Sequence, residues 1–142
     1  MDAAGAPTRI EHIGIAVKNL DEAVAVYEKL LGVPPYAREE VPDQRVRTAF
    51  FRLGESKIEL LESTDPEGPI AKFIAKRGEG IHHVAYAVGD VRAALSGLAE
   101  SGIQLIDGAP RRGAEGLSVA FVHPRSVCGV LTEITDPGPL RP

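Results

Sequence analysis

The feature that most constrains this fold is an internal repeat of strand-like sequence. Residues 9–17 read RIEHIGIAV and residues 80–88 read GIHHVAYAV, so that His12 falls on His83 at an offset of 71 residues. The match continues into the next segment of each copy, where apolar residues recur at helical spacing. Self-similarity at a fixed offset indicates a duplicated structural unit. We therefore expect two copies of one module, each opening with a strand that carries a histidine.

Each of these two strands is predicted to have a bulky apolar face and a nearly bare face. Side chains alternate between the faces of a strand. In each copy the histidine therefore shares its face with small residues, Gly14 and Ala16 in the first and Ala85 and Ala87 in the second. A face turned to the core is normally filled to close packing, so small residues beside a histidine leave room for a ligand. The alternative, a buried structural histidine, fits a single copy better than two equivalent ones.

Length and composition narrow the class of protein. A chain of 142 residues suits one ordinary domain, or two small halves that share a core. A net charge of −4 and the absence of tryptophan argue against a nucleic-acid-binding surface. No apolar run approaches the ~20 residues of a membrane span, and the N-terminus lacks the pattern of a signal peptide. The single cysteine, Cys128, cannot form an internal disulfide, so we expect a cytoplasmic protein.

Periodicity and turn signals predict an α+β fold made of two β-α-β-β-β modules. The predicted domain covers residues 9–136, with module one at 9–63, a connector helix within 64–79 and module two at 80–136. The ends, residues 1–8 and 137–142, are expected to be flexible. Within the modules we expect helices at 20–31, 69–76 and 91–101, strands at 35–40, 45–53, 57–61, 103–106, 117–122 and 130–135, and a glycine-rich loop at 110–116.

The repeat also pairs two glutamates. Glu59 and Glu133 hold the same place in the last strand of each module. If the modules pack about a pseudo-twofold axis, these carboxylates and the two histidines, His12 and His83, converge in one trough. Two imidazoles and two carboxylates suit Co²⁺, Zn²⁺, Mn²⁺ or Ni²⁺. Four protein ligands leave two octahedral positions for substrate or water. Solvated strand charge is the alternative interpretation of the glutamates.

The remaining polar residues are given simpler interpretations. Glu11, Glu62 and Glu79 are expected to be surface charges. His82 points away from the face of His83 and is expected to support a ligand or to be structural. His123 lies in a turn ahead of a proline, where a turn function is expected.

These residues resemble those of the vicinal oxygen chelate superfamily, the glyoxalase, bleomycin resistance and dioxygenase fold. That resemblance implies two modules forming a half-barrel around a metal site. Over about residues 9–136 the chain is more narrowly similar to the methylmalonyl-CoA epimerase family, and the similarity is carried by residues 9–17, 58–62, 69–73, 78–85, 121–126 and 129–134. By resemblance the metal ligands are His12, Glu59 (glutamine in some relatives), His83 and Glu133. Co²⁺ is the favoured ion and a homodimer is implied.

The same resemblance implies an isomerase of propionate metabolism with an acyl-CoA substrate. Such an enzyme interconverts (2R)- and (2S)-methylmalonyl-CoA through an enolate, and a divalent cation stabilises the developing charge. Glu133 is the expected base as well as a ligand. Two positions depart from the family, because Thr48 stands where some relatives have a glutamate and Glu115 where many have a histidine. The second acid/base group is therefore unassigned.

Three other functions fit the same fold. A glyoxalase I-type lactoylglutathione lyase, or another metal-dependent isomerase, would use the same ligand types on a different substrate. An extradiol dioxygenase would need two histidines and one glutamate with Fe²⁺, and the additional carboxylate of Glu59 argues against it. A non-enzymatic small-molecule-binding protein would not need an intact set of four metal ligands.

Overall fold

The structure is a computed structural model that describes residues 5–138. Those residues divide into two compact units, one built from residues 13–82 and the other from residues up to 12 together with those from 83 onward. Of the ends expected to be flexible, residues 1–4 and 139–142 lie outside the described part. Strand β1 (Pro7–Ala16) already begins within the expected N-terminal lead, and it gives its first half to one unit and its second half to the other.

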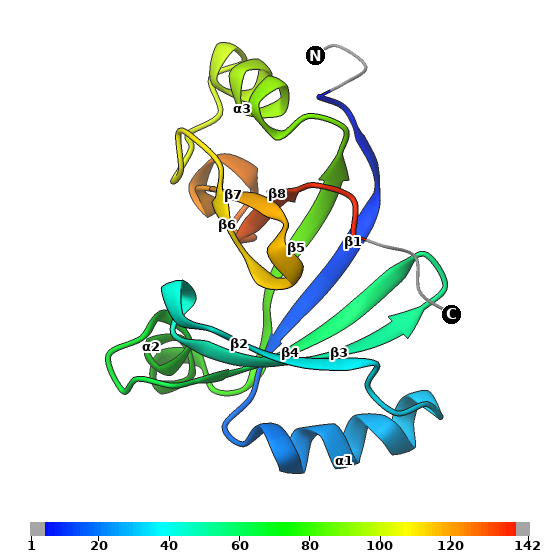
Figure 1. Ribbon diagram of the computed structural model, residues 1–142. Helices are drawn as coiled ribbons and strands as arrows, with labels where there is room; N and C mark the ends of the chain where they lie inside the picture. Colours follow the sequence, from blue (N-terminus) through cyan, green and yellow to red (C-terminus); the bar gives the residue numbers. More distant parts are fainter. Residues whose placement is uncertain (1–4, 139–142) are drawn as a thin grey trace. The chain divides into compact units, whose positions relative to one another are not determined.

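The unit of residues 13–82 is a sheet packed against helices, in which the pairs β2–β3 and β3–β4 are antiparallel. Its strand order is β2-β3-β4-β1, and α1 lies along β3 and β4 (Figure 1). The elements after β1 are α1 (Leu20–Leu31), β2 (Ala37–Val41), the 3₁₀ turn η1 (Pro42–Gln44), β3 (Val46–Leu53), β4 (Ser56–Ser63) and α2 (Pro69–Arg77).

Helix α1 begins and ends where its sequence predicts. The Asn19 side chain accepts a hydrogen bond from the backbone N–H of Glu22 at 3.0 Å, which caps the first turn. Gly32 ends the helix with φ at +74°, a left-handed conformation that glycine adopts without steric cost. The buried face of α1 packs on one face of the sheet, and this core contains Val17, Leu20, Val24, Ala49, Phe51 and Leu60.

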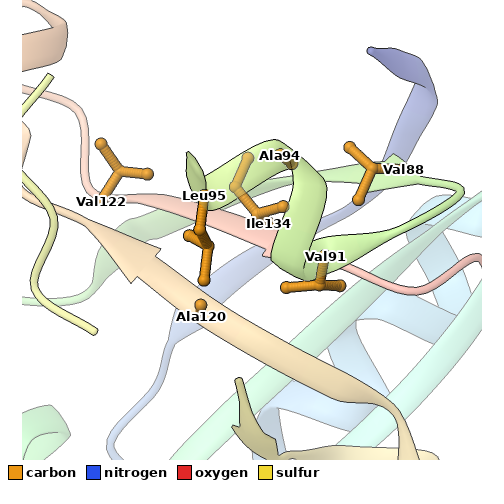
Figure 2. Close-up of a cluster of buried hydrophobic side chains, with 7 residues drawn as sticks. All are labelled: Val88, Val91, Ala94, Leu95, Ala120, Val122 and Ile134. Carbon is orange, nitrogen blue, oxygen red and sulfur yellow. The ribbon is translucent and has the colours of Figure 1, made fainter. Parts of the chain in front are cut away.

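The other unit repeats this plan. Its strand order is β1-β5-β8-β7-β6, with β5 and β8 parallel and the pairs β7–β8 and β6–β7 antiparallel. Helix α3 packs on the sheet through a cluster of small and branched apolar side chains, seen in Figure 2 as Val88, Val91, Ala94, Leu95, Ala120, Val122 and Ile134. The elements are β5 (Gly80–Val88), α3 (Val91–Glu100), β6 (Arg111–Arg112), η2 (Ala114–Gly116), β7 (Ser118–Val122), η3 (Pro124–Val127) and β8 (Thr132–Thr135).

The element order confirms the predicted α+β fold with two β-α-β-β-β copies, but two details of the second copy were wrong. The strand expected at 103–106 is reduced to one bridge between Leu105 and Val122. Two backbone N–H groups that could have extended this pairing donate to side chains instead. Phe121 N donates to the Asp107 carboxylate at 2.9 Å, and Gln104 N donates to the Ser126 hydroxyl at 2.8 Å. The strand β6 forms instead inside the expected glycine-rich loop.

Candidate metal centre

Two buried histidines meet on neighbouring strands. His12 on β1 and His83 on β5 are 5% and 3% exposed, and their Nε2 atoms lie 3.0 Å apart. The rings are perpendicular, at 88°, with centroids 5.1 Å apart. Because β1 and β5 are adjacent strands, the two histidines lie side by side and their rings meet edge to face.

Glu133 joins this pair from β8. Its Oε2 atom lies 3.2 Å from His12 Nε2, and the residue is 4% exposed. The parallel register places Glu133 opposite Ala85, which shares a strand face with His83. On its other side Glu133 is paired with Phe121 of β7, whose ring centroid lies 5.8 Å from that of His83. The Glu133 carboxylate therefore lies beside the His12 imidazole, and the ring of Phe121 packs next to His83.

The spacing of these three donor atoms fits a divalent transition-metal ion. Metal–ligand bonds to histidine and carboxylate are about 2.1 Å long, which puts adjacent donors of an octahedron about 3.0 Å apart. The observed separations from His12 Nε2 are 3.0 Å to His83 and 3.2 Å to Glu133. Nitrogen and oxygen donors of this kind suit Co²⁺, Ni²⁺, Zn²⁺ and Mn²⁺. The donor set is consistent with a divalent cation but does not identify the element.

Glu11 corrects one sequence prediction. It was expected to be a surface charge, yet it is 0% exposed and its Oε1 atom lies 2.6 Å from His12 Nδ1. Strand alternation assigns Glu11 to the face opposite His12, but a glutamate side chain is long enough to return to the ring of its neighbour. The available signal in the sequence was a carboxylate adjacent to a candidate metal ligand.

Glu59 belongs to the unit of residues 13–82. It lies on β4, where the neighbouring Leu60 faces the α1 core, so its side chain is on the opposite sheet face. Glu59 is 4% exposed, and this face carries two further buried polar residues, Thr48 and Lys57, beside the apolar Phe50 and Leu61. The ring of Phe50, the register partner of Glu59, lies 5.1 Å from Lys57 Nζ. A buried polar face of this kind is unusual for a sheet that needs only structural packing.

The other singled-out residues have structural contacts. The His82 ring packs edge-on against Phe73, with centroids 5.0 Å apart. His123 Nδ1 accepts from Arg125 N at 3.1 Å, which confirms its expected turn function. Glu62 accepts a hydrogen bond from Leu20 N at 3.0 Å, and the exposed Glu79 accepts one from Lys18 N at 2.8 Å. Within residues 5–138, no helix combines the length and the apolar character needed to span a bilayer.

Comparison with known proteins gives consistent results. Residues 11–121 match the family model described as the Glyoxalase/Bleomycin resistance protein/Dioxygenase superfamily. The chain is 40% identical to the uncharacterized protein YqjC of Bacillus subtilis, with 91% of this chain and 92% of YqjC covered. It is also 40% identical to the ethylmalonyl-CoA/methylmalonyl-CoA epimerase of Cereibacter sphaeroides, with 89% and 96% covered.

A solved structure extends this similarity to three dimensions. The structure described as methylmalonyl-CoA epimerase in complex with methylmalonyl-CoA and NH₄⁺ is 36% identical to this chain. It matches with a TM-score of 0.89 over 92% of this chain and 95% of its own.

Proposed function

Because this chain belongs to the Glyoxalase/Bleomycin resistance protein/Dioxygenase superfamily, we propose that it is a metal-dependent epimerase of methylmalonyl-CoA. The observation that carries the proposal is that His83 Nε2 and Glu133 Oε2 lie 3.0 Å and 3.2 Å from His12 Nε2. It occurs in a chain that is 40% identical to the ethylmalonyl-CoA/methylmalonyl-CoA epimerase of Cereibacter sphaeroides. The expected product is the other C2 epimer, and the enzyme would be an isomerase of propionate metabolism.

We propose that His12, Glu59, His83 and Glu133 hold the divalent cation, with Co²⁺ favoured and Zn²⁺, Mn²⁺ or Ni²⁺ as alternatives. All four residues are buried. Glu59 is included because it holds the repeat position of Glu133 and lies on a buried polar face. When bound, the cation supplies positive charge that stabilises the enolate oxygens of the substrate. On this proposal residues 9–136 act as one domain.

Glu133 is the proposed base. A carboxylate that accepts the C2 proton must lie within hydrogen-bond reach of it, and burial favours proton transfer by limiting competition from water. Epimerisation then needs a proton delivered to the opposite face of C2. Thr48 has no carboxylate to offer for this step, and its hydroxyl lies 3.5 Å from the Glu39 carbonyl oxygen. The second proton carrier is therefore sought among the other groups of the centre.

Three further properties are proposed, the first from a solved relative and the other two from the sequence and its family resemblance. The substrate is an acyl-CoA thioester, as in the solved epimerase complex with methylmalonyl-CoA. The protein is proposed to be cytoplasmic and to form a homodimer.

The test is deuterium exchange at C2. Full-length protein loaded with Co²⁺ is incubated with methylmalonyl-CoA in D₂O, and incorporation is followed by mass spectrometry. A metal-stripped sample and Glu133→Gln are run beside it, and Glu55→Gln is the matched control because Glu55 is exposed in the β3–β4 turn. We expect exchange in the wild type and the control only. Metal affinity of Glu133→Gln, measured separately, distinguishes a lost base from a lost ligand.

The alternative function is tested in the same series. The glutathione hemithioacetal of methylglyoxal is offered to each metal-loaded sample, because a glyoxalase I-type enzyme would convert it. Exchange at C2 that is absent with Co²⁺, Zn²⁺, Mn²⁺ and Ni²⁺ would contradict the epimerase. Turnover of the hemithioacetal would then favour the lyase.

A further inference from the structure

We infer that Glu11 is a positioning residue that sets the orientation and proton position of the His12 imidazole. The inference rests on the proposed metal centre and adds to it a residue outside the proposed set of ligands. It begins from a short contact in the site, the 2.6 Å between Glu11 Oε1 and His12 Nδ1. Both residues are buried, so water does not compete for this hydrogen bond.

The direction of the hydrogen bond follows from its chemistry. An ionised carboxylate can only accept, so on this inference His12 Nδ1 carries the proton and donates it to Glu11. In the neutral ring, Nε2 is then left with its lone pair. That atom is the one that lies 3.0 Å from His83 Nε2 and 3.2 Å from Glu133 Oε2. Glu11 therefore presents the correct nitrogen to the point where the other donors meet.

The repeat shows that the strand itself does not need this carboxylate. The residue equivalent to Glu11 in the second copy is His82, which precedes His83 on β5. Strand β5 forms with an imidazole at that position, and the ring packs against Phe73. An ionised carboxylate is also a costly group to bury unless its charge is used. The 2.6 Å contact with His12 gives the Glu11 carboxylate such a use.

A carboxylate that orients a histidine ligand raises the ligand's basicity, and its loss lowers metal affinity about 10–100-fold. We expect a reduction in this range for Glu11→Ala. Glu11→Gln keeps an acceptor oxygen but loses the charge, so its affinity should lie between those of Glu11→Ala and the wild type.

The experiment measures binding directly and does not depend on turnover. Metal-stripped full-length proteins are titrated with Co²⁺ and with Zn²⁺ against a chromophoric chelator, and the visible spectrum of the Co²⁺ form is recorded. Glu11→Asp is the conservative variant, and Glu62→Gln is the matched control, because the Glu62 carboxylate bonds to the backbone of α1. Thermal unfolding without metal identifies any variant that has lost its fold. Such a variant is replaced by Glu11→Gln, which is nearly isosteric.

The outcomes separate this inference from the metal centre on which it rests. Weaker binding and an altered Co²⁺ spectrum in the Glu11 variants, with wild-type behaviour in Glu62→Gln, would support it. Wild-type binding by folded Glu11→Gln and Glu11→Ala would overturn the inference and leave the metal centre standing. A wild type that binds neither ion would overturn both.

Discussion

His12 Nε2 lies 3.0 Å from His83 Nε2, although the two histidines are 71 positions apart in the chain. Two imidazole nitrogens at this distance share a proton or a cation. Replacement of His83 by alanine removes one donor and should lower the affinity for Co²⁺ by at least about 100-fold, the upper end of what losing a supporting residue costs. Competition with a chromophoric chelator measures the change. His123→Ala is the matched control, since His123 serves a turn, and equal losses in both variants would contradict the prediction.

The substitution Glu59→Gln tests the proposed fourth ligand. An amide oxygen can still bind a cation but carries no charge, so we expect weaker metal binding than in the wild type and stronger binding than in His83→Ala. Unchanged affinity for Co²⁺, with Glu55→Gln as the exposed control, would remove Glu59 from the ligand set. Chiral analysis of the thioester is a second measurement. Exchange at C2 without inversion in Glu59→Gln would assign the second proton transfer to this carboxylate.

The substitution Phe51→Ala tests the apolar core between α1 and the β2-β3-β4 sheet. Phe51 is completely buried in the cluster formed with α1. Phe51→Ala removes a large apolar side chain and leaves a cavity, so we expect the free energy of unfolding to fall by about 3–5 kcal/mol. Urea denaturation measures this change. Val26→Ala, on the exposed side of α1, should change stability far less.

Asp65 is expected to make a contribution to the free energy of unfolding that depends on pH. The backbone N–H of Glu67 and then Arg45 stabilise its ionised form, and together they lower the pKa of the carboxyl below 3.8. A group whose pKa is lower in the folded state stabilises the fold above its unfolded pKa, and this contribution is lost as the pH falls through the folded pKa. The difference in unfolding free energy between wild type and Asp65→Asn should therefore be present near pH 6 and be lost as the pH falls through the lowered pKa of Asp65. A difference that does not change with pH would contradict this.

Much of the fold could be predicted because its signals are local. Caps and periodicity are enough to locate α1, and the repeat of His12 and His83 is enough to indicate the duplicated strands. Residues 103–106 were harder, because their apolar character favours a strand whereas the side chains of Asp107 and Ser126 compete for its backbone bonds.

Glu11 could not be placed from the sequence for a different reason. Alternation of polar and apolar residues identifies the buried face only where the other face is exposed to water. Glu11 and His12 are consecutive and both buried, so β1 is covered on both sides at this point. A glutamate in such a segment has the same sequence pattern as a surface charge. The contact between Glu11 and His12 can be recognised only in the three-dimensional structure, where the position of the His12 ring is known.

The unit that holds His12, His83 and Glu133 is discontinuous in the chain, since all of residues 13–82 lie between its two parts. A cation bound there would act as a cross-link, closing a loop that contains the whole of the other unit. Closing such a loop has an entropic cost that grows with its length. The fold already closes this loop when the first half of β1 pairs with β5, before any cation binds. On the ribosome, a nascent chain that stops before residue 83 already contains every strand of the β2-β3-β4 sheet, yet only one imidazole of the pair.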